Sequence, residues 1–81
     1  MRIESLTRNV LRVVAKHTEG MRNVYGEGFK VAMRPSAITK KLGNMFGVTP
    51  GGVNKALTEL VAQGKLNREY RGKKPIFFLP E

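Results

Sequence analysis

The sequence predicts an α+β domain with three helices, a short strand and a C-terminal β-hairpin. Three observations lead to this prediction. Apolar residues recur at three- and four-residue steps in three segments, which is the period of an amphipathic helix. At 29–34 they alternate with other residues, which is the period of a half-buried strand. Two further segments, at 66–71 and 75–79, are typical of strands and flank a short Gly-Lys turn at 71–74, as in a hairpin.

The chain is strongly basic. Its 81 residues suffice for one domain with a small core, and a hydrophobic content of 41% is ordinary for a folded protein. Fifteen Lys and Arg against six Asp and Glu give a net charge of +9. The excess positive charges repel one another in the folded state, and binding of a polyanion relieves this repulsion. The net charge therefore favours DNA, RNA or an anionic membrane as the partner, but it does not distinguish among these three.

The sequence offers little for catalysis. It has no cysteine, which excludes disulfides, thiolate metal sites and cysteine nucleophiles. His17 is the only histidine, and paired carboxylates and a Gly-Lys-Ser/Thr phosphate loop are absent from the sequence. We therefore expect no enzyme activity, catalytic residue, metal or cofactor. Without a membrane-spanning or signal-peptide stretch, the protein is expected to be intracellular, either cytoplasmic or nucleoid-associated.

The first helix is predicted at about 4–19, and Gly20 is expected to end it. Leu11 and Ala15 flank its apolar face and could widen the core or form a subunit contact. A basic stripe repeats at four-residue spacing on another side of the helix, a pattern that most often belongs to a solvated face. The apolar face carries Ile3, Leu6, Val10, Val13, Val14 and His17, and the basic stripe carries Arg8, Arg12 and Lys16.

The segment after Gly20 contains three glycines within 20–28 and then the alternating residues of the predicted strand at 29–34. Residues 21–25 could pair with that strand as a hairpin around 26–28. The sequence does not indicate what this segment does.

The second helix is predicted at 36–46, with Ser36 as its N-cap. Its apolar residues are Ile38, Leu42, Met45 and Phe46. This assignment keeps Gly43 inside the helix at a cost of about 1 kcal/mol relative to alanine. The alternative is that Gly43 ends the helix and 44–48 form a longer turn. We prefer the first, because 47–49 then form the tight turn of a helix-turn-helix.

The third helix, at 50–63, has the clearest boundaries. Thr49 can cap it, Pro50 suits the first helical position, and Gly64 stands where a C-cap is expected. Its apolar face carries Val53, Ala56, Leu57, Leu60 and Val61. The opposite face is small, polar and cationic, which suits a DNA major groove, and it carries Gly51, Asn54, Lys55, Thr58, Glu59 and Ala62.

The C-terminal hairpin, at about 65–80, is predicted to have strands at 66–71 and 75–79. Leu66, Phe77 and Leu79 are expected to reach the core, and either Tyr70 or Phe78 to be partly exposed. The hairpin is cationic, with Lys65, Arg68, Arg71, Lys73 and Lys74 offset only by Glu69.

This order of elements resembles the winged helix-turn-helix family over nearly the whole chain. Its sharpest piece, Phe46-Gly47-Val48-Thr49-Pro50-Gly51-Gly52-Val53 followed by Leu57, Leu60 and Gly64-Lys65-Leu66, is similar to the turn and recognition helix of MarR-like and GntR-like transcriptional regulators. The resemblance implies a small transcription regulator that places helix 50–63 in the major groove of double-stranded DNA. The hairpin at about 65–80 would be the wing, and its tip, at 71–74, would contact the backbone or an adjacent minor groove.

The contacts divide into two sets. The resemblance implies that DNA meets the start of the recognition helix at Thr49, Gly51, Gly52, Asn54, Lys55 and Thr58. Phosphate neutralisation is expected from the wing and the second helix through Lys40, Lys41, Arg68, Arg71, Lys73 and Lys74. Because Gly51 and Gly52 cannot read base edges with side chains, they fit a close approach of phosphate.

Two other functions remain open. An RNA- or ribosome-associated protein would dock the same basic faces on structured RNA by its shape. A protein-interaction module would use the fold as a scaffold and the charge for solubility. If the chain forms a homodimer, the contact would come from Leu11 and Ala15 or from 21–28.

Overall fold

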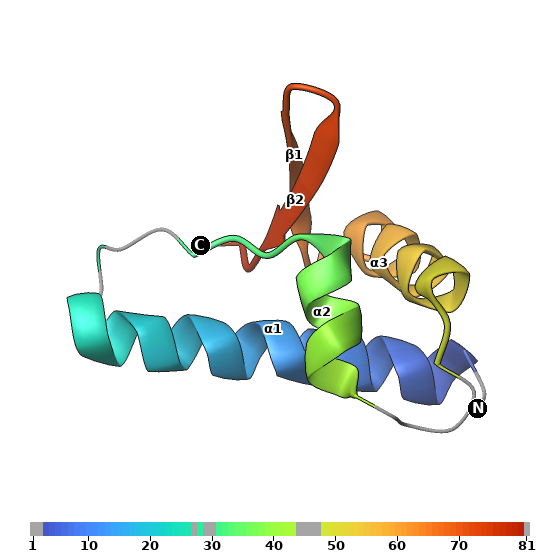
Figure 1. The fold of residues 1–81 in the computed structure, drawn as a ribbon, viewed down its shortest axis with the longest axis horizontal. Helices are drawn as coiled ribbons and strands as arrows, with labels where there is room; N and C mark the ends of the chain where they lie inside the picture. Colours follow the sequence, from blue (N-terminus) through green and yellow to red (C-terminus); the bar gives the residue numbers. More distant parts are fainter. Residues whose placement is uncertain (1–2, 27, 29–30, 44–47, 81) are drawn as a thin grey trace.

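The computed structural model describes residues 3–26, 28, 31–43 and 48–80. In this part of the chain the elements follow the order α1 (Ile3–Tyr25), α2 (Pro35–Leu42), α3 (Pro50–Ala62), β1 (Asn67–Arg71) and β2 (Lys74–Phe78). The helices α2 and α3 pack on the long helix α1, and the antiparallel hairpin β1–β2 rises on the side away from α1 (Figure 1). The predicted α+β class with three helices and a C-terminal hairpin is confirmed.

Helix α1 is longer than the sequence predicted. It continues through Gly20 to Tyr25, so the predicted helix end at Gly20 and the predicted hairpin at 21–25 are both wrong. A glycine inside a helix costs only about 1 kcal/mol relative to alanine. Beyond Gly20 the helix borders the C-terminal segment, since Arg22 lines a hollow together with Leu79.

The core-facing side of α1 differs from the predicted one at its C-terminal half. Leu6, Val10 and Val14 are buried as predicted, and Thr18 rather than His17 continues the buried stripe. Burial of Thr18 costs little, because its hydroxyl donates a hydrogen bond of 2.8 Å to the Val14 carbonyl. The buried core cluster comprises Leu6, Val10, Val14, Met33, Ile38, Leu42, Val53, Ala56, Leu57, Leu60, Leu66 and Phe77. The side chain of Ile3 lies outside the described residues.

The predicted strand at 29–34 is represented by one β-bridge. Met33 and Phe77 exchange two backbone hydrogen bonds of 2.8 Å, so β2 lies between β1 and Met33. Val31 and Met33 are buried and Arg34 is exposed, in agreement with the predicted alternation. Residues 29 and 30 lie outside the described part of the chain.

Helix α2 begins and ends earlier than predicted. Arg34, not Ser36, occupies the N-cap position, because Pro35 takes the first helical position that its fixed φ favours. The helix stops at Leu42, and Gly43 follows it with φ 67° and ψ −142°, a conformation that suits glycine. Gly43 therefore ends α2, and the prediction that keeps Gly43 inside the helix is wrong. The predicted helical residues at 44–46 lie outside the described part of the chain. The predicted tight turn at 47–49 falls partly within 44–47, which the structure does not describe.

Helix α3 agrees closely with its prediction. The Thr49 hydroxyl accepts a hydrogen bond of 3.0 Å from the Gly52 N–H, and Pro50 is the first helical residue. At the other end, the N–H groups of Gly64 and Lys65 donate to carbonyls of the last turn at 3.1 and 2.9 Å. This pair of bonds is a Schellman motif, which satisfies carbonyls that the helix itself cannot.

The hairpin pairs Asn67 with Phe78 and Arg71 with Lys74, which leaves a two-residue loop. Gly72, its first residue, has φ 62°, whereas Lys73 does not have a positive φ. This combination is typical of a type II′ turn, which needs glycine at that position. The predicted turn at 71–74 is confirmed.

Only the base of the hairpin enters the core. Leu66 and Phe77 are buried, and Leu79 is half-buried against them, as predicted. Every residue of β1 is exposed, including Tyr70 at 61%. The sequence analysis missed the burial of Ile76. The remainder of the hairpin therefore projects from the body with its cations exposed.

Candidate nucleic-acid interface

The outer face of α3 presents exposed polar residues at its N-terminal end. Gly51, Asn54, Lys55 and Thr58 are exposed, as predicted. The Thr58 hydroxyl donates a 3.0 Å hydrogen bond to the Asn54 carbonyl, so its oxygen remains able to accept one. Within the described part of the chain, the structure gives the Asn54 amide and the Lys55 ammonium no partner. These two side chains are the ones on this face best suited to address an external ligand.

The two glycines of α3 differ in their surroundings. A Cβ at Gly51 would have nothing within 4 Å, whereas a Cβ at Gly52 would lie 3.2 Å from Thr49 Oγ1 and 3.3 Å from Leu6 Cδ2. Gly52 therefore lets α3 pack closely on α1 and leaves room for the Thr49 cap. Of the two, only Gly51 offers an open backbone to a phosphate.

A groove between α2 and α3 brings two predicted contact residues together. Lys40 from α2 and Asn54 from α3 line it, although they are far apart in the sequence. Its volume is about 440 Å³, and its remaining lining residues are Pro35, Ser36, Thr39 and Pro50. Lys41 lies elsewhere, in a hollow against α1. The predicted pair of neighbouring lysines thus serves two different surfaces.

A second depression joins α2 to the hairpin and includes a cation that the sequence analysis missed. Arg34 and Lys74 line it together with Pro35, Ser36 and Pro75. The bridge between Met33 and β2 is what brings Arg34 beside the hairpin. The sequence signal that could have identified Arg34 is its position directly before Pro35, which begins α2. Because Pro35 and Ser36 line both depressions, we call the combined surface the α2 trough; it runs from Lys74 past Arg34 to Lys40 and Asn54.

The hairpin continues this basic surface. Arg68, Arg71, Lys73 and Lys74 are all exposed. The Arg68 guanidinium carbon lies 5.8 Å from the centroid of the exposed Tyr70 ring, within the range of a cation–π contact. A flat ring and a guanidinium group on the same strand can stack on a sugar or an unpaired base.

The charge along this interface is mostly positive. The described acidic residues on α3 and β1 are Glu59 and Glu69. The Glu59 carboxylate accepts a hydrogen bond of 3.1 Å from Gln63 Nε2, towards the C-terminal end of α3. The cations at the N-terminal end of α3, in the α2 trough and on the hairpin are Arg34, Lys40, Lys55, Arg68, Arg71, Lys73 and Lys74.

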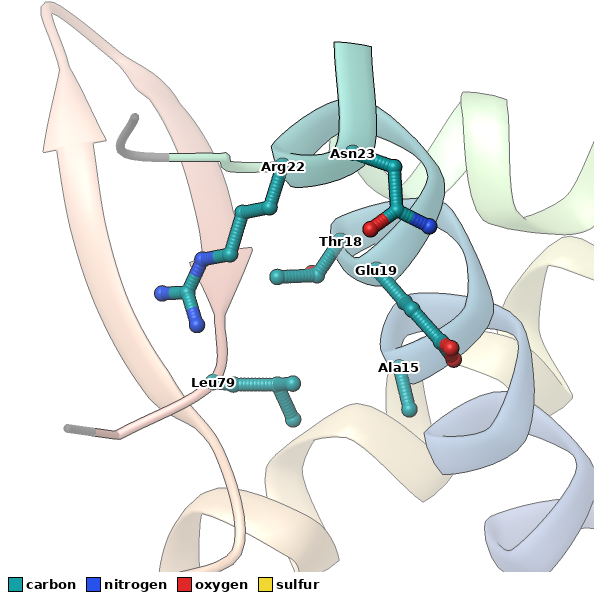
Figure 2. Close-up of a pocket in the computed structure, with 6 residues that line it drawn as sticks. All are labelled: Ala15, Thr18, Glu19, Arg22, Asn23 and Leu79. Atoms are coloured by element: carbon teal, nitrogen blue, oxygen red, sulfur yellow. The ribbon is translucent and has the colours of Figure 1, made fainter. Parts of the chain in front are cut away.

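Another hollow lies on the C-terminal half of α1 (Figure 2). It is lined by Ala15, Thr18, Glu19, Arg22, Asn23 and Leu79. The Arg22 side chain extends towards the C-terminal segment, whereas the Glu19 carboxylate points away from it (Figure 2). Arg22 Nε is buried and has no hydrogen-bond partner among the described residues. Within the described residues, the Glu19 carboxylate and the Arg22 guanidinium of this hollow thus point in different directions (Figure 2).

The surfaces predicted for a homodimer are only partly accessible. Leu11 and Ala15 are half-buried, and Leu11 packs against the core cluster. Val24 and Tyr25, at the end of α1, are 73% and 62% exposed. The second predicted surface is thus the more accessible one, and the homodimer itself stays a prediction.

In the residues that the structure describes, no group of three or more His, Asp or Glu is placed to hold a metal ion. Over the same residues, no helix combines the length and apolarity needed to cross a membrane. Searches of protein-family models, of curated proteins and of solved structures found no match to this chain. Its function is therefore inferred from its own residues.

Proposed function

We propose that this chain is a DNA-binding protein of the winged helix-turn-helix type, acting as a small transcription regulator. Helix α3 would lie in the major groove, with the hairpin as the wing on the backbone or an adjacent minor groove. The order of three helices and an antiparallel hairpin is compatible with that layout. Such a protein would act where DNA is, in the cytoplasm or on the nucleoid.

One observation carries the proposal: cations from the hairpin and from α2 with its N-cap lie along one connected surface beside Asn54 of α3. The α2 trough links Lys74 on the hairpin, Arg34 before α2, and Lys40 beside Asn54 of α3. Clustering of like charges raises the energy of the folded state, and counterion release on binding a polyanion more than recovers it. A protein-interaction module that uses the fold only as a scaffold would not need cations gathered in this way.

The dimensions of α3 fit a major groove. The helix has 13 residues, which corresponds to a length of about 20 Å, and a B-DNA major groove is about 12 Å wide. Asn54 and Lys55 have the groups that bond to base edges, and Gly51 allows the backbone to approach a phosphate. The α2 trough lies beside the start of α3, where a strand bordering the groove would pass.

A specific observation also supports a second candidate, binding of RNA or other single strands. Tyr70 is exposed next to Arg68, and aromatic–arginine surfaces stack on unpaired bases. On this reading, Tyr70→Leu would weaken binding to a single strand and leave duplex binding unchanged. The groove beside the exposed N-terminal end of α3, lined by Lys40 and Asn54, favours the duplex.

The test is a titration of labelled random duplex DNA and of a structured RNA across a salt series. We expect the duplex to bind more tightly, with a logarithmic affinity that falls steeply and linearly with the logarithm of salt. A preference for the RNA would favour the second candidate. Absence of binding to both at low salt would reject both and favour a protein-interaction module.

A further inference from the structure

The structure carries a second basic surface, on the side of α1 that faces away from α3. Arg8, Arg12 and Lys16 are exposed at four-residue steps. Val10 and Val14, two residues before and after Arg12, are both 0% exposed. Since successive helical residues are rotated by about 100°, Arg12 lies almost opposite both valines. The row therefore points away from the core and from the helix α3 that packs against it.

Helix α2 adds a further cation to this surface. Lys41 lines a hollow with Val13, Lys16 and His17, so lysines from two helices border one depression. Among the residues that the structure describes, no acidic side chain lines it. Glu19, three residues after Lys16, lines the different hollow of Figure 2. Bringing Lys16 and Lys41 together without an acid favours an external anion. We call Arg8, Arg12, Lys16 and Lys41 the α1 face.

The α1 face is separate from the proposed DNA interface. Lys55 in α3 is two residues from the buried Val53 and from the buried Leu57, so it lies on the outer side of that helix. Arg12 has the same spacing from Val10 and Val14 in α1. Each outer side thus points away from the core between the two helices. Lys40 and Lys41 are neighbours in α2, but Lys40 lines the groove beside α3 and Lys41 lines the hollow against α1. A duplex bound along α3 therefore leaves the row of cations on α1 exposed.

We propose that the α1 face binds a second segment of double-stranded DNA, so that one molecule bridges two duplexes; this inference rests on the proposed function. The row of cations on α1 repeats at about 6 Å along a straight axis, which suits a rod-like polyanion. A membrane surface fits less well, because binding there requires an exposed apolar face. Here the apolar face of α1 is buried in the core.

The experiment is a bridging assay. One duplex is attached to beads, a second, labelled duplex is free in solution, and its protein-dependent recovery is measured. Two variants carry the same loss of charge: R8Q/R12Q/K16Q removes cations of the α1 face, and K40Q/K73Q/K74Q removes cations of the trough and hairpin. Affinity for a single short duplex, thermal unfolding and solution mass are measured for each.

We expect the α1-face variant to retain single-duplex affinity within about twofold, while recovery of the free duplex falls at least about fivefold. The trough and hairpin variant should lose single-duplex affinity by at least about tenfold. Solution mass should be the same for both variants and the wild type.

Several outcomes would overturn the inference. Undiminished bridging by the α1-face variant would show that another surface, such as a dimer contact, supplies it. Equal loss of single-duplex affinity in both variants would place the two faces on one duplex. Wild-type binding without bridging would reject the second site and leave the proposed function standing, whereas no duplex binding at all would reject the proposed function itself. Binding of anionic vesicles through the α1 face, without bridging, would assign that face to a membrane.

Discussion

The hydroxyl oxygen of Thr49 accepts a hydrogen bond of 3.0 Å from the backbone N–H of Gly52, and this bond fixes where α3 begins. The first N–H groups of a helix have no partner inside the helix. Pro50 has no N–H to satisfy, and Thr49 satisfies that of Gly52. One side chain thus sets the start of the helix that carries Asn54 and Lys55.

Replacing Thr49 by alanine should lower the free energy of unfolding by about 1 kcal/mol, because the cap is lost. Thr49→Ser is the matched control, since its hydroxyl can form the same bond and should retain most of the stability. Urea unfolding of both variants measures the difference. Equal stabilities of the two variants would show that the cap contributes nothing.

The two glycines next to the cap should respond differently to alanine. Gly51→Ala should raise stability by roughly 0.5–1 kcal/mol, because a Cβ there meets no neighbour and alanine favours a helix. Gly52→Ala should be the less stable of the two, because its Cβ would press on Thr49 and Leu6. Thermal unfolding ranks the pair.

The same pair tests the approach of DNA to Gly51. If a phosphate approaches the Gly51 backbone, Gly51→Ala should weaken duplex binding although it stabilises the fold. Undiminished affinity of this variant would remove Gly51 from the interface. A stability of Gly52→Ala equal to or above that of Gly51→Ala would contradict the packing argument.

Alanine substitutions at Gly20 and Gly43 should have opposite effects on stability, because Gly20 lies inside a helix and Gly43 ends one. Gly20→Ala should stabilise the protein by about 0.5–1 kcal/mol, because Gly20 lies inside α1 with open space around it. Gly43→Ala should destabilise it by roughly 1–2 kcal/mol, because φ there is 67°. Chemical denaturation of both variants is the measurement, and a destabilised Gly20→Ala would instead support a helix end at Gly20.

The features that the sequence predicted well are determined by local chemistry. The Thr49 cap, Pro50 and the Schellman end of α3 depend on residues within a few positions of one another. The two-residue hairpin loop is likewise specified by Gly72 between two strand-like segments. In such places the chain itself contains the information that fixes the structure.

The errors arose where distant segments decide the outcome. Past Gly20, α1 borders a hollow that Arg22 lines together with Leu79, a residue far from it in sequence. Periodicity also favoured a longer α2, but the backbone conformation of Gly43 ends it. In the candidate interface, the position of Arg34 depends on the Met33–Phe77 bridge, and the divergence of Lys40 and Lys41 depends on how α1, α2 and α3 pack.

Lys73, at the hairpin tip, is expected to contact phosphate rather than bases. Lys73→Gln should weaken binding about equally on all duplex sequences and reduce the salt slope by roughly one unit. Arg12→Gln removes the same charge from the α1 face and should leave the slope for a short duplex unchanged. A loss confined to particular sequences would assign base readout to the tip.

Asn54 is the residue for which we predict base discrimination. It is exposed at the start of α3, and its amide can both donate and accept, as bonding to adenine requires. Once a preferred duplex has been selected from random sequences, Asn54→Ala should reduce its advantage over unselected DNA by about 1–3 kcal/mol. Competition binding at fixed salt measures that advantage. Lys40→Gln is the control, because Lys40 lines the same groove and should weaken both duplexes alike. If Asn54→Ala also weakens both alike, Asn54 acts on the backbone, and the readout must come from Lys55 or Thr58.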